Sequence, residues 1–420
     1  MRDGFIKVAA GTPEIRVADC THNAQQCLTL MRQAAEQGVK VLCLPELCLT
    51  RYACGDLFLQ ESLLQGAEDA LAHIIRETKD LDLVTALGVP VRYHGKLFNC
   101  AAVLCRGELL GLVPKLNLPN YTEFYEGRWF TSGRALMGSD FCVPFAGQEN
   151  VEFSPGLLFR CADLPQLCIG VEICEDLWVA DTPSTRLAQG GATLILNPSA
   201  SDETVCKDDY RRTLLSATSG RLVCGYVYAD AGWGESSTDL IYAGHSLIAE
   251  NGTILAQRRF ETGLTVTELD LEKLCHERQR MSTFPADAPD VFPQYFRLNV
   301  EETTLTRRPR GPGRPVPGNS HSVRPGAETA PGPHRGQNGG GGAVRRTGLH
   351  PGPAHHRPGH GHAGPAHDGH SGRDHALLRH HQPDQVQRPG PGRAHRHDVR
   401  HRGHRRRGED PLPGHRPVHG

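Results

Sequence analysis

Short apolar runs alternate with amphipathic stretches along residues 1–300 of the 420-residue chain. The runs FIKVAA (5–10) and VKVLCLPE (39–46) predict buried strands, and the second ends at a carboxylate. Between them, NAQQCLTLMRQAAEQG (23–38) has the apolar spacing of a helix that stops at a glycine. Further helices are predicted at about 61–79, 183–189 and 207–220, and further strands at LVTALGVPV, LCIGVEIC, GATLILNPSA, LVCGYVYAD and LTVTELD.

Two hairpins are predicted where apolar runs flank a turn dipeptide. LFNCAAVLCRGELLGLVPK (97–115) turns at Arg106-Gly107, and HSLIAENGTILAQR (245–258) turns at Asn251-Gly252. Near-continuous apolar strands with helices between them are typical of sheets that are buried on both faces. We therefore expect the first 300 residues to form a layered α/β domain.

The composition changes sharply at residues 301–420. This segment contains 20 arginines and 18 of the chain's 23 histidines, but no Phe, Trp, Tyr, Ile, Met, Cys or Lys. Such a segment cannot build a hydrophobic core, so we expect a disordered tail. The charge divides at the same place: residues 1–300 carry 26 Lys+Arg against 38 Asp+Glu (−12), and the tail carries 20 against 9 (+11).

Two interpretations of the tail remain open. One is a genuine basic tail that attracts nucleic acid or other polyanions. The other is an out-of-frame translation of a GC-rich coding sequence, because Pro, Gly, Arg and Ala have GC-rich codons whereas Lys, Ile, Phe, Tyr and Met do not. The absence of lysine favours the second interpretation.

The cysteines and the N-terminus bear on the compartment. All 14 cysteines lie in the first 300 residues, without a Cys-x-x-Cys pair or a regular spacing. This pattern favours reduced thiols over disulfides. The start MRDGFIKVAA lacks a signal-peptide pattern, and no segment reaches the roughly 20 apolar residues that span a bilayer. We expect a soluble, cytoplasmic protein without membrane contact.

Three segments place a reactive side chain at the end of a predicted strand: Glu46 in LCLPELCLTRY, Lys115 in GLVPKLNLPNYTEFYEGRWF, and Cys174 in IGVEICEDLW. Each alone has an ordinary explanation, since cysteines are often core residues and strand-end charges are usually solvated. Together they are chemically coherent. A thiol needs a base or a cation nearby to become a nucleophile at neutral pH, and a lysine can stabilise an oxyanion.

These segments resemble the Glu-Lys-Cys triad motifs of the nitrilase, or carbon-nitrogen hydrolase, superfamily. LPNYTEFYEGRWF, EICEDLW and NPSAS follow the order found in one branch, the glutaminase domain of glutamine-dependent NAD synthetases. The resemblance covers nearly all of residues 1–290 and implies an α/β fold of the nitrilase type, an αββα sandwich. It implies Cys174 as nucleophile, Glu46 as the base that accepts its proton, and Lys115 as oxyanion stabiliser.

The resemblance implies further site residues. Glu126, in YEGRWF, matches a second carboxylate that holds Lys115 and supports hydrolysis; the alternative is an exposed loop charge. Lys207 stands where some relatives have arginine, so a forked contact with the substrate carboxylate would become a point-charge contact. For Ser201 and Lys207 the alternative is a capped helix start. The positions that match glutamine-binding residues of the branch are Tyr121, Glu175, Ser201 and Lys207.

A reaction and a domain plan are also implied. The hydrolase domain would occupy residues 1–290, a linker 291–305, and the tail 306–420. Glutamine would be the substrate, and its ammonia would serve NAD synthesis from deamido-NAD and ATP. In the family, ATP and Mg bind a second domain with a Ser-Gly-Gly-x-Asp-Ser loop, which this chain lacks. We therefore expect glutamine hydrolysis without a cofactor, no synthetase half in this chain, and assembly into a homo-oligomer.

Two other functions compete with this interpretation. One is a stand-alone amidase or nitrilase that acts on another small amide, and the other is a non-catalytic domain whose basic tail binds polyanions. Nucleic-acid binding is disfavoured because the tail lacks lysine and aromatic stacking residues. The five histidines of the first 300 residues show no metal-ligand spacing, so we expect no metal site.

Overall fold

Two β-sheets form the centre of the fold. The computed structural model describes residues 4–138, 141–237, 239–285, 290–299 and 305–307. The first sheet has the strand order β14-β1-β2-β3-β4-β5-β7-β6, and the second has the order β13-β12-β11-β10-β9-β8-β15. The strands are β1 (Phe5–Thr12), β2 (Val41–Cys43), β3 (Val84–Tyr93), β4 (Lys96–Cys105), β5 (Glu108–Pro114), β6 (Phe141–Phe145), β7 (Gln148–Phe153), β8 (Leu157–Cys161), β9 (Cys168–Val171), β10 (Leu194–Ser199), β11 (Gly225–Asp230), β12 (Ser246–Glu250), β13 (Thr253–Arg258), β14 (Gly263–Asp270) and β15 (Phe292–Phe296).

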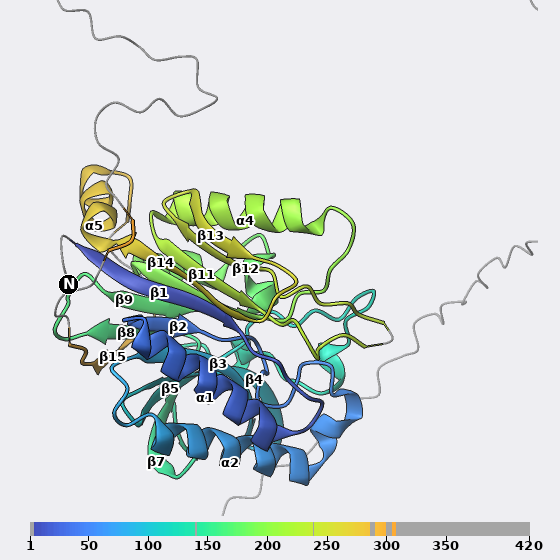
Figure 1. Ribbon diagram of the computed structural model, residues 1–420. Helices are drawn as coiled ribbons and strands as arrows, with labels where there is room; N and C mark the ends of the chain where they lie inside the picture. Colours follow the sequence, from blue (N-terminus) through green and yellow to red (C-terminus); the bar gives the residue numbers. More distant parts are fainter. Residues whose placement is uncertain (1–3, 139–140, 238, 286–289, 300–304, 308–420) are drawn as a thin grey trace, which may run out of the picture. The chain divides into compact units, whose positions relative to one another are not determined.

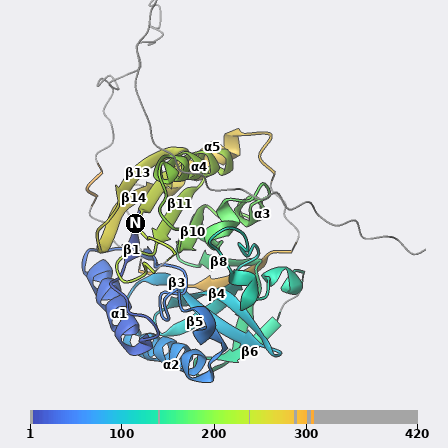
Figure 2. The same cartoon turned by 90° about the vertical axis from the view of Figure 1, so that its right-hand side faces the viewer.

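Helices cover the outer faces of both sheets (Figure 1). Helices α1 and α2 pack on the first sheet, whereas α3 and α4 pack on the second, and Figure 2 shows the same layers from the side. The α-helices are α1 (Cys20–Glu36), α2 (Glu61–Glu77), α3 (Pro183–Gln189), α4 (Lys207–Leu222) and α5 (Leu271–Arg280), and the 3₁₀ helices are η1 (Gly55–Leu59), η2 (Glu126–Arg128), η3 (Gly133–Leu136) and η4 (Cys174–Leu177).

The two sheets pack face to face through a shared apolar core. Val8 and Val41 of the first sheet belong to the same buried cluster as Ile169 and Val227 of the second. Strands β1, β2 and β3 are parallel, as are β9, β10 and β11, so each sheet has a parallel centre that is buried on both faces. The expected αββα sandwich is therefore confirmed.

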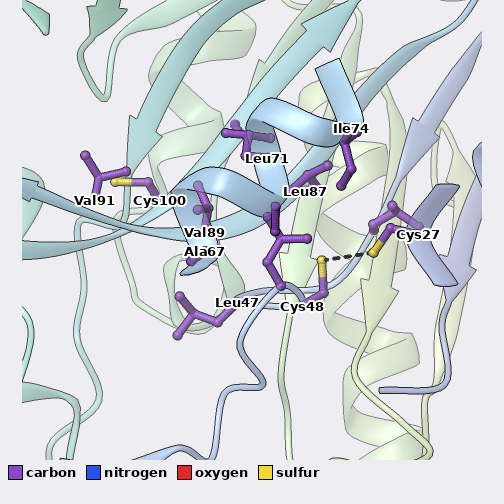
Figure 3. Packing of buried hydrophobic residues seen from close by; sticks show 14 of the residues in the cluster. Cys27, Leu47, Cys48, Ala67, Leu71, Ile74, Leu87, Val89, Val91 and Cys100 are labelled. Atoms are coloured by element: carbon purple, nitrogen blue, oxygen red, sulfur yellow. Dashed lines mark hydrogen bonds between the residues drawn. The ribbon is translucent and has the colours of Figure 1, made fainter. Parts of the chain in front are cut away.

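A second apolar core lies under the helices of the first sheet (Figure 3). Leu71 of α2 packs in the same cluster as Leu87 and Val89 of β3, and each such buried side chain contributes about 1.5–3 kcal/mol. The Sγ atoms of Cys27 and Cys48 lie 3.9 Å apart in this core. The described part of the chain contains no disulfide.

Both predicted hairpin turns are confirmed. Arg106 and Gly107 join β4 to β5 with φ angles of +50° and +78°. Asn251 and Gly252 join β12 to β13 with φ angles of +44° and +84°. Two successive residues with positive φ give the backbone twist that suits a two-residue hairpin, which explains why these dipeptides identified the turns.

Several predicted boundaries differ from the structure. The helix predicted at 23–38 begins at Cys20, because the Asp19 side chain accepts a hydrogen bond from the backbone N–H of His22. The strand predicted at 39–46 is only Val41–Cys43, so Glu46 lies in the following loop. Strand β15 pairs with β8 inside the stretch expected as a linker. The tail from residue 308 onward lies outside the described residues.

Candidate active site

Cys174 lies in a tight turn directly after β9. The strand predicted to reach residue 174 ends at Val171, and the Cys174 backbone N–H donates to Asn197 Oδ1 at 2.8 Å. Cys174 has a φ of +45°, an uncommon conformation for a residue with a side chain, and such backbone strain gathers at functional sites. This turn starts η4 and holds the thiol at the interface between the sheets.

The surroundings of Cys174 keep the thiol protonated at rest. Burial raises the pKa of the Cys174 thiol well above its usual value, and the negative charge of Glu46 raises it further. The ammonium of Lys115 and a hydrogen bond with Ser199 act in the opposite direction. A thiolate therefore forms here only if a neighbouring base takes the proton.

Glu46 is fully buried in the loop after β2. Its Oε1 accepts a hydrogen bond from Lys115 Nζ at 2.6 Å, and its Oε2 accepts one from the backbone N–H of Ala200 at 3.0 Å. Gly88 of β3 allows the Glu46 loop to approach, because a Cβ at this position would lie 1.9 Å from the backbone nitrogen of Leu47. Contacts from both sheets thus fix the carboxylate.

Lys115 follows β5 and joins two carboxylates. Its Nζ donates to Glu46 Oε1 at 2.6 Å and to Glu126 Oε1 at 2.5 Å, and all three side chains are buried. Burial alone would lower the pKa of Lys115, but the charges of Glu126 and Glu46 outweigh it and hold the pKa well above its usual value. Lys115 therefore remains a cation in an interior position.

Glu126 opens η2 and faces the same ammonium. Its Oε1 also accepts a hydrogen bond from the Tyr52 hydroxyl at 2.8 Å. Burial raises the pKa of Glu126 to about 7, against the lowering effect of Lys115, and Glu46 adds to the rise. The alternative expectation of an exposed loop charge is wrong, because Glu126 is 1% exposed.

Asp176 connects the turn of Cys174 to the segment that follows β5. Its carboxylate accepts from the backbone N–H of Asn117 at 2.8 Å, from that of Leu116 at 3.4 Å and from that of Ile173 at 3.0 Å. The residue directly after Lys115 is thus fixed to the turn that carries the thiol. Cys174, Lys115 and Glu46 come from segments far apart in the sequence, and the fold brings them together.

Tyr121 and Glu175 form one edge of the site. The hydroxyl of Tyr121 donates to Glu175 Oε1 at 2.8 Å, and the Tyr121 ring contacts Phe124 edge-on. Burial raises the pKa of Glu175, whereas Tyr121 and Lys115 lower it. Because Tyr121 is 54% exposed and Glu175 adjoins Cys174, this pair lies between the thiol and solvent.

Lys207 begins α4 and lies between two aromatic rings. Its Nζ is 5.7 Å from the ring centroid of Phe124 and 5.4 Å from that of Trp178, and it donates to Asp202. Together with Tyr121, these contacts place Lys207 beside the pair that adjoins Cys174. Of the residues expected to bind glutamine, Tyr121, Glu175 and Lys207 therefore gather on one side of the thiol.

Ser201 is buried and points into a polar network. Its backbone N–H donates to Asp230 Oδ1 at 2.9 Å, and its hydroxyl accepts from Arg211 Nη2 at 3.2 Å. For Ser201 the alternative of a helix cap is wrong, because α4 begins at Lys207 and the residue before it is Cys206, which makes no side-chain cap. Ser201 therefore contacts Arg211 of α4 and does not lie in the first turn of that helix.

Sequence reasoning missed four side chains of this site. Tyr52 and Asn99 contact the carboxylates, while Asp176 and Asn197 hold the turn of Cys174. Only Asp176 had a local signal, a carboxylate two positions after the candidate nucleophile. The others lie in apolar or loop segments, and only the tertiary fold brings them to the site.

A cavity of about 220 Å³ adjoins this cluster. Tyr52 and Phe124 belong to its walls, and both also contact site residues. Tyr52 separates the cavity from the buried carboxylates, since its ring lies 5.9 Å below Lys115 Nζ and its hydroxyl binds Glu126. The other wall residues are Ala53, Gly55, Glu123, Tyr125, Trp129, Ser237, Asp239 and Leu240.

The described residues offer neither a cluster of metal ligands nor a membrane-spanning helix. They contain no group of three or more His, Cys, Asp or Glu side chains that could hold a metal ion. Their helices include none that is both long enough and apolar enough to cross a membrane.

Comparison with known proteins identifies one matching family model. The carbon-nitrogen hydrolase family matches residues 7–277. The glutamine-dependent NAD(+) synthetase of Mycobacterium tuberculosis is 41% identical over 284 residues, which cover 67% of this chain and 41% of the relative. The synthetase of Aquifex aeolicus is 30% identical over 300 residues, covering 68% and 48%. The chain thus spans less than half the length of these curated relatives.

Solved structures show the same relationship. A glutamine-dependent NAD(+) synthetase from Cytophaga hutchinsonii matches with a TM-score of 0.55 and 30% identity, over 63% of this chain and 42% of that one. An amidase from Nesterenkonia sp. matches with a TM-score of 0.50 and 21% identity, over 67% of this chain and 97% of that one. The second similarity concerns the fold alone.

Proposed function

The chain belongs to the carbon-nitrogen hydrolase family, and we propose that it hydrolyses the side-chain amide of glutamine with Cys174 as the nucleophile. The family makes it an enzyme that acts on amide C–N bonds. The observation that carries the proposal is the buried ion network in which Lys115 joins Glu46 and Glu126 beside the thiol. Glutamine as substrate is supported by the glutamine-dependent synthetases that match this chain.

The first half of the reaction uses the thiol and its base. Glu46 removes the proton of Cys174 as the sulfur attacks the amide carbon, and the carbonyl oxygen becomes negatively charged. Lys115 has an N–H beyond the two that bind carboxylates, and with the backbone N–H of Glu175 it stabilises that oxygen. Protonated Glu46 returns its proton to the leaving nitrogen, so that ammonia departs and a thioester remains on Cys174.

The second half regenerates the thiol. A water molecule attacks the thioester carbonyl while Glu46 accepts its proton, and the same two donors stabilise the second oxyanion. Collapse of this intermediate breaks the C–S bond, releases glutamate and returns the proton to the sulfur of Cys174. Glu126 holds Lys115 in place throughout, and Lys207, Tyr121 and Glu175 bind the amino-acid head group.

A role for the ammonia in NAD synthesis belongs to this proposal. The 420 residues contain no Ser-Gly-Gly-x-Asp-Ser loop, so we propose that they supply glutamine hydrolysis and make no NAD alone. Incubation of the purified chain with deamido-NAD, ATP, Mg²⁺ and glutamine is expected to give glutamate without NAD. Formation of NAD would contradict this part of the proposal.

The substrate assignment is tested by measuring glutamate and ammonia from glutamine beside a panel of short aliphatic amides. The wild-type chain is expected to turn over glutamine, Cys174→Ala is expected to be inactive, and Cys224→Ala, at a buried cysteine directly before β11, should retain activity. Turnover of another amide with none of glutamine would instead favour a stand-alone amidase.

A further inference from the structure

Asn99 of β4 lies beside Lys115 because of the register between β4 and β5. The two strands pair with Cys100 opposite Pro114, and the backbone N–H of Lys115 donates to the carbonyl of Asn99 at 2.8 Å. The β4–β5 hairpin therefore directs two hydrogen-bond donors toward Glu46: the ammonium of Lys115 and the side-chain amide of Asn99. The side chain of Asn99 is buried.

The Asn99 amide contacts both carboxylates of the site. Its Nδ2 donates to Glu46 Oε1 at 2.6 Å and has a longer contact of 3.5 Å with Glu126 Oε2. Because ionised carboxylates only accept hydrogen bonds, the NH₂ end of the amide must face them. The Oδ1 atom of Asn99 is buried without a hydrogen-bond partner among the described residues. Burial of this unsatisfied oxygen has a free-energy cost. We therefore attribute the role of the amide to the hydrogen bonds that its NH₂ group donates.

The charge balance of the site explains what that NH₂ group can do. Lys115 is one cation shared by two carboxylates, so the ion network carries excess negative charge whenever both carboxylates are ionised. Asn99 adds a donor to Glu46 that has no charge and does not titrate. The bond from Asn99 therefore holds Glu46 without depending on the charge of Lys115.

We propose that Asn99 is a positioning residue that holds the Glu46 carboxylate in the orientation in which it accepts the proton of Cys174. The inference rests on the proposed role of Glu46 as the base. Asn99 acts through the carboxylate of Glu46, to which it donates, and not on the substrate. The titratable groups that face Glu46 from the surrounding elements are Lys115, Glu126, Cys174, Tyr52, Tyr242 and Glu235.

The pH profile of glutamine hydrolysis separates this role from a structural one. In Asn99→Leu, the ionised carboxylate loses a charge-assisted hydrogen bond, so kcat/KM at neutral pH should fall about 10- to 100-fold with little change in KM. The midpoint of the low-pH limb of the kcat/KM profile should shift to a higher pH by about one unit or more. Asn99→Asp, which keeps the shape and adds a third carboxylate, should move the limb at least as far.

Cys100→Ala is the matched control, because Cys100 is the next residue on β4 and packs in the core under α2. This variant should keep the wild-type pH limb even if its stability falls. A loss of activity in folded Asn99→Leu and Asn99→Asp that is the same at every pH, or a limb that stays in place, would overturn the inference.

A second measurement keeps this test separate from the substrate assignment. The rate of alkylation of Cys174 by iodoacetamide, followed by mass spectrometry of its peptide, reports proton removal from the thiol without any substrate. The low-pH limb of this rate should shift upward in both Asn99 variants and stay in place in Cys100→Ala. If glutamine is not hydrolysed but the limb shifts, the substrate proposal fails and the Asn99 inference holds; an unshifted limb overturns it.

Discussion

The ammonium of Lys115 lies 2.6 Å from a carboxylate oxygen of Glu46, and both side chains are almost fully buried. Removal of two charges from water costs several kcal/mol each, which a single contact rarely offsets. Here the cost is reduced by a second carboxylate on Lys115 and by a backbone N–H on Glu46. The network is therefore poorly suited to stabilise the fold. Because buried groups with perturbed pKa values gather at functional sites, we expect the catalytic site to lie here.

Replacement of Lys115 by methionine leaves two buried carboxylates without their cation. We expect kcat/KM for glutamine to fall about 100- to 1,000-fold, since an oxyanion donor is lost. The free energy of unfolding should fall by about 3–5 kcal/mol, as when a buried pair loses one partner. Kinetics and urea unfolding of the same preparation measure both. Lys40→Met, which breaks the more exposed pair with Asp82, should cost less than about 1 kcal/mol and leave activity intact.

Gly88 permits the close approach of the Glu46 loop, and alanine at this position should be severe. The new methyl would lie 1.9 Å from the Leu47 nitrogen, so the loop that carries Glu46 must move. We expect loss of activity together with a lower melting temperature. Gly66→Ala in α2 is the control, because its nearest neighbour is 3.6 Å away and the change should stabilise the helix by about 0.5–1 kcal/mol. Wild-type activity in Gly88→Ala would contradict this account of the loop.

Glu235 makes stability depend on pH. Burial raises its pKa from 4.5 to about 8, and its Oε2 is buried without a partner among the described residues. Between these pH values the folded state binds more protons than the unfolded chain, so this residue lowers stability as the pH rises from about 4.5 to 8. In Glu235→Gln this pH-dependent loss should disappear. The free energy of unfolding of the variant, relative to that of the wild type, should therefore be about 2–4 kcal/mol higher at pH 8 than at pH 5. Urea unfolding of the variant and the wild type at the two pH values measures this effect. The same difference in unfolding free energy at both pH values would contradict the raised pKa of Glu235.

Lys207 is the proposed contact for the charged head group of the substrate. In Lys207→Met the aromatic neighbours remain while the cation is lost, so we expect KM for glutamine to rise about 10-fold or more with kcat nearly unchanged. Lys273→Met, which removes a half-exposed partner of Glu250 outside the site, is the control and should leave KM as it is. A fall in kcat at constant KM would assign Lys207 to the chemical step instead.

The fold was largely predictable because its signals are local. Apolar runs marked β1, β3, β10 and β11, and the dipeptides at 106–107 and 251–252 marked both hairpin turns. The three strand-end segments also named the side chains that converge at the site. Each of these features depends on a few adjacent residues, and therefore leaves a trace in the sequence.

The remaining features depend on partners that are far apart in the chain. Asn99 lies in an apolar run and gains its role only from the register with Lys115. The raised pKa of Glu235 comes from burial by the fold, and an isolated carboxylate in the sequence gives no hint of it. Strand β15 finds its partner β8 more than 130 residues earlier. Tertiary contacts of this kind leave no local pattern to read.

The central claim is that Cys174 attacks an amide and carries the acyl group. Acid quenching during glutamine turnover, followed by mass spectrometry of the peptide that contains Cys174, tests it most directly. The account predicts a glutamyl thioester on Cys174 in the wild-type chain and none in Cys174→Ala, with turnover lost in that variant. Continued glutamine hydrolysis by Cys174→Ala, or an acyl group on another residue, would contradict it.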